Sequence, residues 1–418
     1  MTDQFIYLIT NDQRIHDNPI LEYLTENKIK FLPVYIFNKK EFENTNWGFN
    51  RMGPIRLKFL LESLKELNDK FISESGSGLN IFFGDPKDVL LELKKQIGIS
   101  KLIKSKQYSY YETEFEKEIQ KEFNLKLIES FTLFEISDLP FQIENTPRSF
   151  TKFRKQVEKN GTLRLYGELQ GKLNILNNVK SDLPKEINAF IDKTKLIYDG
   201  GESKGLERLK YYLWDTNAIE TYKETRNSLM GDTFSGKFSP WLSNGNLSPL
   251  KIWFEVEEYE SKVKSNQSTY WMKFELLWRE YFKYIALQNS KNLFMLNGFK
   301  DYTKYKNKDL SIFENWKSGN TEHKLINAFM NEIHDTGFMS NRGRQIVASY
   351  FVKDLGMDWR IGAAWFEHLL IDYDSESNWG NWAYQAGVGN DPIDDRRFNP
   401  DLQMKKFDPN GEFVKSWS

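Results

Sequence analysis

The chain of 418 residues is long enough for two or three domains, and its hydrophobic content of 39% can supply sizeable cores. Its net charge of -1, from 58 basic and 59 acidic side chains, excludes a uniformly basic nucleic-acid binder, so a DNA site has to be a local patch. The lack of cysteine excludes disulfides and cysteine nucleophiles, and the 4 histidines have no ligand spacing, so we expect no metal.

The first residues, MTDQFIYLITNDQR, have too short an apolar run and too acidic a start for a signal peptide. No apolar stretch in the sequence approaches the length of a membrane span. We therefore expect a cytoplasmic protein without membrane contact, and we expect it to be a monomer.

Short apolar runs alternate with amphipathic segments in residues 1–130. The predicted strands are Phe5–Thr10, Phe31–Phe37, Leu79–Gly84, Lys101–Lys106 and Leu125–Ser130. The predicted helices between them are Pro54–Phe71, Pro86–Ile97 and Tyr111–Phe123, and Asp17-Asn18-Pro19 is typical of a helix cap. This alternation predicts a doubly wound parallel sheet of the Rossmann-like kind.

Residues 131–204 read as an interdomain linker, with prolines at 140, 147 and 184 and one helix at Phe150–Lys159. Strand patterns disappear in residues 205–418. The main predicted helices there are Lys204–Leu213, Leu250–Val263, Tyr270–Gln288, Thr321–Ile333, Arg342–Leu355 and Trp359–Leu370. The predicted fold class is therefore α/β plus all-α, with an N-terminal sheet domain and a C-terminal helical domain.

The segment Gly231–Phe238 fits most of the phosphate-binding pattern G-x-x-x-x-G-K-[ST]. Phe238 cannot supply the hydroxyl that holds magnesium, and the preceding residues do not form the required strand, so we exclude an ATPase. The loop can still bind phosphate through free N–H groups, with hydroxyl or ammonium contacts from Ser235, Lys237 and Ser239.

Within Tyr270–Gln288, a carboxylate shares one predicted helix face with three aromatic side chains. These residues are Trp271, Glu275, Trp278 and Phe282. One interpretation is a core helix in which Glu275 pairs with an arginine. The other is the wall of a pocket, where an aromatic ring stacks on a planar ligand and the carboxylate accepts its hydrogen bond.

Two further segments carry dense polar groups. The run SNRGRQ at 340–345 opens a predicted helix and places Asn341, Arg344 and Gln345 at one end of it. Residues 372–384 read as a loop rich in acids, amides and aromatics, and tryptophans in a loop require an explanation.

Several motifs in order resemble those of the photolyase/cryptochrome family over nearly the whole chain. They are RIHDN (14–18), YKETRN (222–227), KFSPWL (237–242), FELLWRE (274–280), TGFMSNRGRQ (336–345), DWR (358–360), DYD (372–374), NWGNW (378–382) and GVGNDP (387–392). Gly343, Gln345, Tyr384 and the segment FDPNGEFV (407–414) resemble the DASH branch in particular.

The resemblance implies that the helical domain binds FAD. The residues that it assigns to the cofactor are Tyr222, Ser235, Lys237, Phe238, Ser239, Asn341, Arg344, Asp372, Asp374 and Asn378. Asn378 would face flavin N5, and Asp372 paired with Arg344 would stay ionised and fix the orientation of the ring. Trp382 and Trp359 would be the first two members of an electron-transfer chain to the flavin.

The activity that the resemblance implies is blue-light-driven repair of cyclobutane pyrimidine dimers. The residues that it places at the lesion are Glu275, Trp278, Asn341, Gln345 and Tyr384. Gln345 and Tyr384 make the pocket polar, which favours single-stranded DNA as the substrate. The expected backbone contacts are Arg226, Arg342, Arg396 and Arg397. The alternative function is a blue-light photoreceptor that signals through the flavin redox state, although the chain lacks the long C-terminal extension common in signalling members.

The sequence departs from the family pattern at a few positions. The surface tryptophan expected near position 306 is absent, and Tyr302 or Tyr305 could replace it. Gly236 replaces a hydroxyl residue of the phosphate loop, at a cost of about 1 kcal/mol for one hydrogen bond. The branch often carries a folate antenna, 5,10-methenyltetrahydrofolate, for which Glu112 matches one contact, whereas Gln107 stands where a carboxylate is common.

Overall fold

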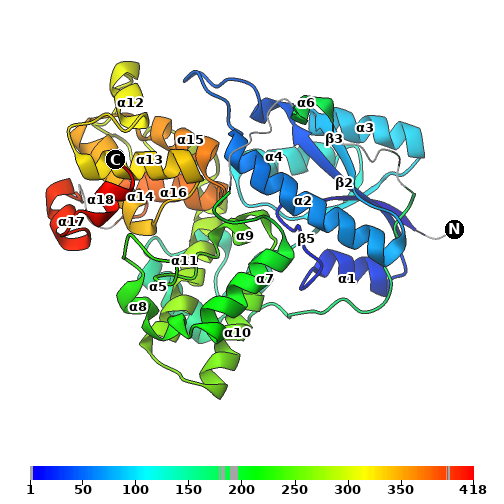
Figure 1. The fold of residues 1–418 in the computed structure, drawn as a ribbon. Coiled ribbons are helices and arrows are strands. Elements are labelled where there is room, and N and C mark those ends of the chain that lie inside the picture. The colour runs from blue at the N-terminus through cyan, green and yellow to red at the C-terminus, as the bar shows by residue number, and fades with distance from the viewer. Residues whose placement is uncertain (1–2, 178, 180–183, 189–195, 392, 394–395) are drawn as a thin grey trace.

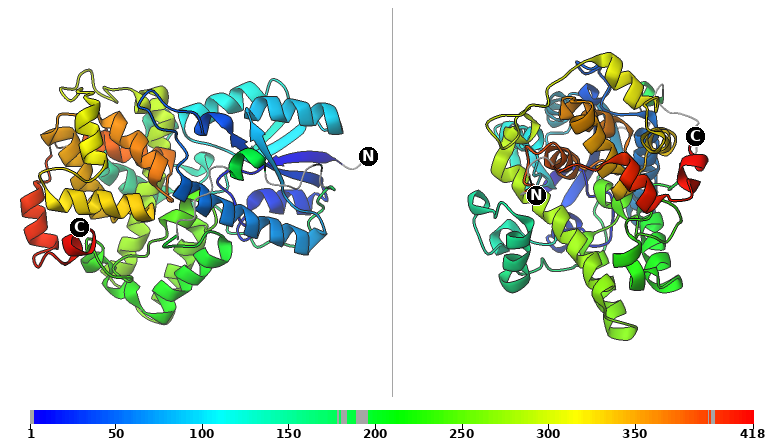
Figure 2. Two further views of the ribbon diagram at one scale, coloured as in Figure 1. Left: turned by 45° about the horizontal axis from the view of Figure 1, so that its top comes forward. Right: turned by 90° about the vertical axis from the view of Figure 1, so that its left-hand side faces the viewer.

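The computed structural model describes residues 3–177, 179, 184–188, 196–391, 393 and 396–418, so the parts of the expected linker at 178, 180–183 and 189–195 lie outside it. An α/β part and a helical part lie side by side (Figure 1). The helical part gathers at the end of the sheet away from the N-terminus (Figure 2). The predicted fold class is thereby confirmed.

The sheet contains five parallel strands in the order β3-β2-β1-β4-β5. They are β1 (Gln4–Leu8), β2 (Lys30–Asn38), β3 (Asn80–Gly84), β4 (Lys101–Ser105) and β5 (Asn124–Ile128). Along β1, Phe5 and Tyr7 face one buried cluster, and Ile6 and Leu8 face another. This period of two, apolar on both faces, is what a parallel sheet covered by helices requires.

Helices cover both faces of the sheet. Helices α1 (Pro19–Glu26) and α2 (Pro54–Ser75) pack on the face of Phe5, and α3 (Pro86–Ile97) and α4 (Tyr110–Ile119) pack on the face of Ile6. The predicted cap is present, because the side chain of Asn18 accepts hydrogen bonds from the N–H groups of Ile20 and Leu21.

The described residues after the sheet form helices and their connections. The helices are α5 (Phe150–Asn160), α6 (Lys185–Asn188), α7 (Glu202–Lys210), α8 (Tyr222–Thr225), α9 (Ser239–Asn244), α10 (Pro249–Lys262), α11 (Gln267–Asn289), α12 (Leu310–Lys317), α13 (Lys324–Thr336), α14 (Asn341–Ser349), α15 (Trp359–Leu369), α16 (Ser375–Gln385), α17 (Pro400–Phe407) and α18 (Glu412–Ser416). The shorter 3-10 turns are Lys39–Glu41, Ile136–Asp138, Ile143–Asn145, Ala218–Thr221 and Ser290–Phe294, and π-helical turns follow α7 at Tyr211–Asp215 and α14 at Tyr350–Asp354.

The first half of the expected linker packs into the helical part. Phe131, Phe150 and Phe153 belong to one buried cluster with Tyr281 and Tyr284 of α11. The fully buried carboxylate of Glu280 also accepts a hydrogen bond from the backbone N–H of Leu133 at 2.9 Å. Residues 131–157 therefore contribute to the core that holds α11 in place.

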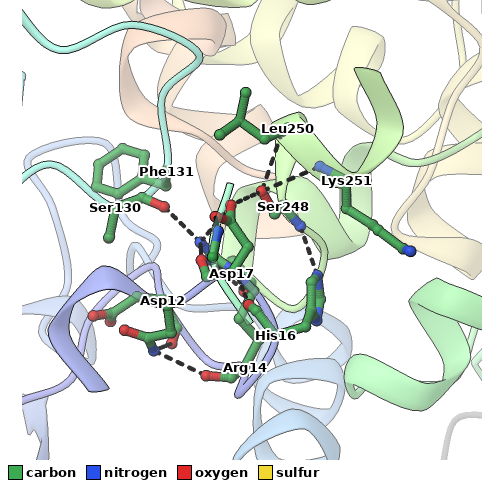
Figure 3. Close-up of polar contacts among 12 residues, drawn as sticks. Asp12, Arg14, His16, Asp17, Ser130, Phe131, Ser248, Leu250 and Lys251 are labelled. Atoms are coloured by element: carbon green, nitrogen blue, oxygen red, sulfur yellow. Dashed lines mark hydrogen bonds and ion pairs between the residues drawn. The ribbon is translucent and has the colours of Figure 1, made fainter. Parts of the chain in front are cut away.

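A buried polar network joins the sheet to the helical part (Figure 3). Arg14, fully buried, donates to the carbonyl oxygens of Ser130 at 2.5 Å and Gly245 at 3.0 Å. The carboxylate of Asp17 accepts a hydrogen bond from the Ser248 hydroxyl and forms a two-pronged ion pair with Arg164 at 2.6 and 3.0 Å. Strand ends, linker and helical part thus meet at two arginines and one carboxylate.

This network occupies a special place in the sheet. The strand order reverses between β1 and β4, and open α/β sheets usually bind ligands outside the carboxyl ends of the strands at such a point. Here the loop after β1 carries Asp12, Arg14 and Asp17 into that crevice, and Ser248 enters from the helical part. The crevice is therefore filled by an interface between the two parts.

His368 forms a second contact between the two parts. Its ring stacks on Trp365 at 4.9 Å, and its Nδ1 lies 2.8 Å from the backbone oxygen of Asn50. Burial lowers the pKa of His368 to about 4, and the nearby charges of Arg56 and Lys317 lower it as well. The hydrogen bond to Asn50 raises the pKa but does not outweigh these effects. The imidazole thus stays neutral in the folded protein under conditions where an unfolded histidine takes up a proton.

We expect His368 to make folding stability dependent on pH. Between pH 6.5 and about 4 the unfolded chain binds a proton that the folded chain does not, so stability is lost as the pH falls through this window. The loss attributable to this group is about 3 kcal/mol at most. Urea unfolding of the native protein and of His368→Asn from pH 7 to pH 4 measures it. Equal pH dependence of both proteins would contradict the assignment.

The described residues contain neither a helix that could cross a membrane nor a cluster that could hold a metal ion. No helix in these ranges is both long enough and apolar enough to cross a membrane. No group of three or more His, Asp or Glu side chains in the same ranges is arranged to hold a metal ion.

Candidate FAD and lesion site

A cavity of about 610 Å³ lies in the helical part, among α8, α9, α11, α14 and α16 and the loop before α9. The predicted site residues that line it are Tyr222, Arg226, Ser235, Lys237, Phe238, Ser239, Glu275, Trp278, Asn341, Arg344, Gln345, Asp372, Asp374, Asn378, Trp382 and Tyr384. Trp359, Arg342, Arg396, Arg397, Glu112 and Gln107 are not among its lining residues. The cavity thus brings together segments between Tyr222 and Gln385, several of which are far apart in the sequence.

One end of the cavity is the loop Phe234–Ser239. A Cβ atom at Gly236 would lie 2.5 Å from the ring of Phe238, so a larger residue there would require this ring to move. Lys237 adopts a left-handed backbone with φ of +54°, and burial lowers its pKa to about 8. A phosphate beside this ammonium would favour its charged form again.

Arg208 holds this loop, although the sequence analysis did not select it. Its guanidinium donates to the carbonyl oxygens of Gly236 at 3.0 Å and Ser235 at 3.2 Å and pairs with Asp232 at 2.9 Å. A basic residue on the buried face of α7, between Gly205 and Leu209, is the signal that could have revealed it.

Two ion pairs occupy the opposite wall. Arg344 pairs with the buried carboxylate of Asp372 at 2.7 Å. Asp374 caps α16 by accepting from the N–H of Ser377 at 2.9 Å, and it pairs with the buried Lys283 at 3.0 Å. Lys283 was missed, although a lysine inside the apolar run YFKYIAL is an unusual position for a charge.

Glu376 shares Lys283 with Asp374. Its carboxylate lies 3.1 Å from the ammonium. Burial raises the pKa of Glu376 to about 7, and the neighbouring carboxylate of Asp374 raises it further, whereas Lys283 opposes the shift. The ammonium of Lys283 therefore mainly serves Asp374, which stays ionised in the cavity wall.

The prediction of a loop at 372–384 was wrong, because Ser375–Gln385 forms α16. Asp374 supplies the N-cap and Glu376 the acidic residue of the first turn, a pattern that favours a helix start. Gly380 weakens the helical pattern in the sequence, yet a Cβ there would lie 2.4 Å from the ring of Phe282. The glycine is therefore required by the packing of α16 on α11.

Helix α16 places the predicted flavin contact and the predicted electron donor. The amide nitrogen of Asn378 donates to the backbone oxygen of Ala363 at 2.9 Å, which fixes the side chain at the cavity wall. The ring of Trp382 packs over Gly362, where a Cβ would lie only 2.3 Å from it. Since Trp359 lies one turn before Gly362 on α15, the two predicted electron-transfer tryptophans occupy neighbouring positions across α15 and α16.

Glu275 lies on the face of α11 that lines the cavity and pairs with Arg226 at 2.9 Å. The guanidinium also lies over the ring of Trp271 at 5.2 Å. Burial raises the pKa of Glu275, and Arg226 opposes this shift. Both interpretations of this helix thus contain a correct element, since the glutamate has an arginine partner and still faces the cavity. Arg226 acts here as the partner of Glu275.

Trp278 is held from behind by the linker helix. Phe150 at the start of α5 stacks on it with a centroid distance of 3.8 Å and an angle of 12°. The ring of Tyr384 meets its edge at 6.3 Å. One face of the indole is thus taken by Phe150, and this support fixes the plane that Trp278 presents to the cavity.

The remaining predicted DNA contacts lie elsewhere. Arg342 donates to the Asn227 side chain at 3.0 Å, and Arg396 pairs with Asp391 at 3.0 Å. Arg397, about half exposed, lies 3.8 Å from Asp354. Their placement as backbone contacts remains a prediction.

The two antenna candidates differ in their surroundings. Gln107 is buried, and its amide donates to the side chain of Thr10 and to the backbone oxygen of Ser105. Its hydrogen bonds therefore lie within the sheet domain. Glu112 at the start of α4 has one buried carboxylate oxygen without a hydrogen-bond partner among the described residues. The folate contact of Glu112 therefore remains a prediction, and the surroundings of Gln107 do not support a folate contact for it.

Comparison with known proteins places this site in a family. Residues 5–170 match DNA photolyase, and residues 271–418 match the FAD binding domain of DNA photolyase. Cryptochrome DASH from Danio rerio is 41% identical over 428 residues, which cover 99% of this chain and 82% of that protein. The chain belongs to the cryptochrome DASH branch of the photolyase/cryptochrome family.

Other members of the family extend the likeness to structure. Cryptochrome DASH from Synechocystis sp. is 40% identical and covers 97% of this chain and 86% of its own length. The crystal structure of a Synechocystis cryptochrome has a TM-score of 0.93 at 38% identity and covers 100% of this chain and 89% of that chain. An archaeal photolyase from Sulfolobus tokodaii with two FAD molecules has a TM-score of 0.80 at 27% identity and covers 99% and 90%.

FAD is the cofactor of this family, and the cavity suits it. Its volume of about 610 Å³ lies within the range of cofactor sites. Asp372 Oδ1 and Gln345 Oε1 are buried acceptors that lack a partner among the described residues. Because buried acceptors are normally satisfied, these two atoms point to a ligand with N–H or O–H groups. The predicted binding of FAD by the helical domain is confirmed at the level of the family.

Proposed function

We propose that this chain is a light-driven lyase that repairs cyclobutane pyrimidine dimers in single-stranded DNA. The observation that carries the proposal is the position of Glu275 and Trp278, which line the same cavity as the predicted flavin residues. A lesion that enters this cavity would lie next to the cofactor, as an electron-transfer reaction requires.

Bound FAD, when reduced and excited by blue light, would supply one electron that opens the cyclobutane ring and then returns. The protein would position the lesion. Trp278, backed by Phe150, offers one ring face for stacking on a flipped-out base. Glu275, oriented by Arg226, offers a carboxylate that accepts hydrogen bonds from the base edges.

The preference for single strands follows from the polarity of the pocket. Gln345 lines the cavity and has a buried acceptor without a partner among the described residues, and Tyr384 adds a hydroxyl. Burial and the neighbouring carboxylate of Asp391 raise the pKa of Tyr384 to about 12, so the phenol keeps its proton. A polar pocket gives little compensation for unstacking a duplex, and a single strand does not require that cost.

The function is tested with chemically reduced, FAD-loaded protein and a dimer-containing single-stranded oligonucleotide, under blue light and in the dark. We expect the dimer to disappear only in the light, and a duplex of the same sequence to react more slowly. No repair by a reduced, flavin-loaded sample would contradict the lyase and favour the photoreceptor function.

Glu275→Gln tests the role of the carboxylate in the same assay. We expect repair to fall about tenfold or more at unchanged flavin content, since a hydrogen bond to a charged group contributes about 1.5–3 kcal/mol. The control is Glu258→Gln, an exposed glutamate of α10 that pairs with Lys262. If Glu275→Gln loses its flavin, the residue serves the fold and not the lesion.

A further inference from the structure

The photoreduction path lacks its expected end. Trp382 and Trp359 match the first two tryptophans of the family path, and position 306 is a lysine. Trp359 is fully buried, and its Nε1 donates to the backbone oxygen of Leu296 at 2.9 Å. A buried indole cannot exchange electrons directly with a reductant in solution, so a further group must connect it to the surface.

Trp379 lies where such a group is needed. It is one turn before Trp382 on α16, and its ring meets the ring of Trp359 at a centroid distance of 5.7 Å. Trp379 is also buried, and its Nε1 donates to the hydroxyl of Tyr373 at 3.2 Å. Its ring thus contacts that of Trp359, and it lies one turn from Trp382 on the same helix.

From Trp379 an aromatic row leads to the surface of the α/β part. The ring of Phe294 lies 5.0 Å from Trp379, and the ring of Tyr111 lies 5.2 Å from Phe294. Tyr111, on α4, is 57% exposed. It can therefore give its phenolic proton to water when it loses an electron, and it can meet a reductant. Tyr373 is only partly buried, but the guanidinium of Arg56 lies over its ring at 4.4 Å and opposes a positive charge there.

The alternative exits are electrostatically unfavourable. Until the phenolic proton has left, an oxidised tyrosine ring carries a positive charge, and an ammonium placed over the ring opposes this first step. Lys306 lies 5.6 Å from the ring of Tyr302, and Lys353 lies 5.5 Å from that of Tyr305. No cation lies over the ring of Tyr111 among the cation–ring contacts of the described residues.

The second tryptophan branch has the same disadvantage. Trp382 meets Trp316 at 6.2 Å, and Phe313 connects Trp316 to Trp365 through steps of 6.3 and 6.1 Å. Lys317 lies over the ring of Trp365 at 5.0 Å. These steps are longer than those from Trp359 through Trp379 to Tyr111, and they end beneath a cation.

We infer that Trp379 and Tyr111 relay electrons to the flavin site and take the place of the missing surface tryptophan. The inference rests on the proposed function only in requiring a photoreducible FAD. The photoexcited oxidised flavin would take one electron from Trp382, and Trp359 or Trp379 would then transfer one electron to the oxidised Trp382. Tyr111 would transfer one electron to Trp379 by way of Phe294 and release its phenolic proton to water. A soluble thiol then returns one electron to the Tyr111 radical, and a proton from water restores the phenol.

The relay is tested by photoreduction of oxidised, FAD-loaded protein with a thiol reductant. We expect Tyr111→Phe and Trp379→Phe to lower the yield of reduced flavin about tenfold or more, the effect of ~1.4 kcal/mol in a competing step. The matched controls Tyr302→Phe and Trp365→Phe should behave as the native protein. A spin trap added during illumination, located by peptide mass spectrometry, should mark Tyr111, and this readout is independent of flavin reduction.

The photoreduction experiments test the relay independently of the repair reaction. Native-like photoreduction in both relay variants, or a spin-trap adduct at Tyr302, Tyr305 or Trp365 in place of Tyr111, would overturn the relay. An illuminated native protein that is not photoreduced would overturn it as well. Chemically reduced Tyr111→Phe should repair dimers at the native rate, so failure of repair in the native protein bears on the proposed function alone.

Discussion

Asp17→Asn is expected to lower the free energy of unfolding by about 3–5 kcal/mol, the usual cost of removing one partner of a buried ion pair. The substitution keeps the size of the side chain but removes the charge that Arg164 contacts at 2.6 and 3.0 Å. The guanidinium of Arg14, fully buried 3.9 Å away, loses the same counter-charge. Two cations would then remain in a dry interface.

Urea unfolding of Asp17→Asn against the native protein measures this loss. The control is Asp69→Asn on α2, whose partner Lys65 is 78% exposed, so its removal should change stability by at most about 0.5 kcal/mol. A loss below about 1 kcal/mol in Asp17→Asn would mean that the neighbouring carbonyl oxygens and Asp12 suffice to stabilise both arginines.

Asp372→Asn is expected to weaken FAD binding about 10- to 100-fold, since a hydrogen bond involving a charged group contributes about 1.5–3 kcal/mol. The carboxylate is 1% exposed, its Oδ2 holds Arg344, and its Oδ1 is free to accept a hydrogen bond from the flavin. An amide in its place loses the charge that orients Arg344 and presents one N–H where an acceptor is needed.

Reconstitution of the apoprotein with FAD, followed by fluorescence, gives the dissociation constant. Asp335→Asn, an exposed carboxylate on α13, serves as the control and should bind as the native protein does. Native affinity in Asp372→Asn would show that the carboxylate orients Arg344 without contacting the cofactor.

The sheet could be predicted almost completely from the sequence, because each strand is an apolar run between turn residues or helix caps. The predicted helix Pro86–Ile97 has the correct first and last residues, because Asp85 caps its start and Gly98 ends it with a φ of +73°. Helix α16 was missed, because Gly380 and three amides hide a pattern whose logic lies in packing against Phe282. Such close contacts between distant segments leave no local signal.

The cavity was predicted through the order and spacing of motifs, and its chemistry was only partly visible. Glu275 and Trp278 could be predicted because their spacing places them on one face of a helix. The partners that position them come from elsewhere in the chain, Arg226 from α8 and Phe150 from the linker. Arg208 and Lys283 were missed for the same reason, since a sequence shows a buried charge but not the carboxylate or carbonyl group that it meets.

The close approach of Gly362 to Trp382 has a consequence for how the reaction rate can be adjusted. A single methyl group at position 362 would act as a spacer between α15 and the indole, because its carbon would lie 2.3 Å from the ring. Electron tunnelling weakens exponentially with distance, so a shift of a few tenths of an ångström would alter the proposed transfer while every redox-active side chain stays in place. If Trp382 donates electrons to the flavin as proposed, a larger residue at position 362 should therefore change the rate of that transfer.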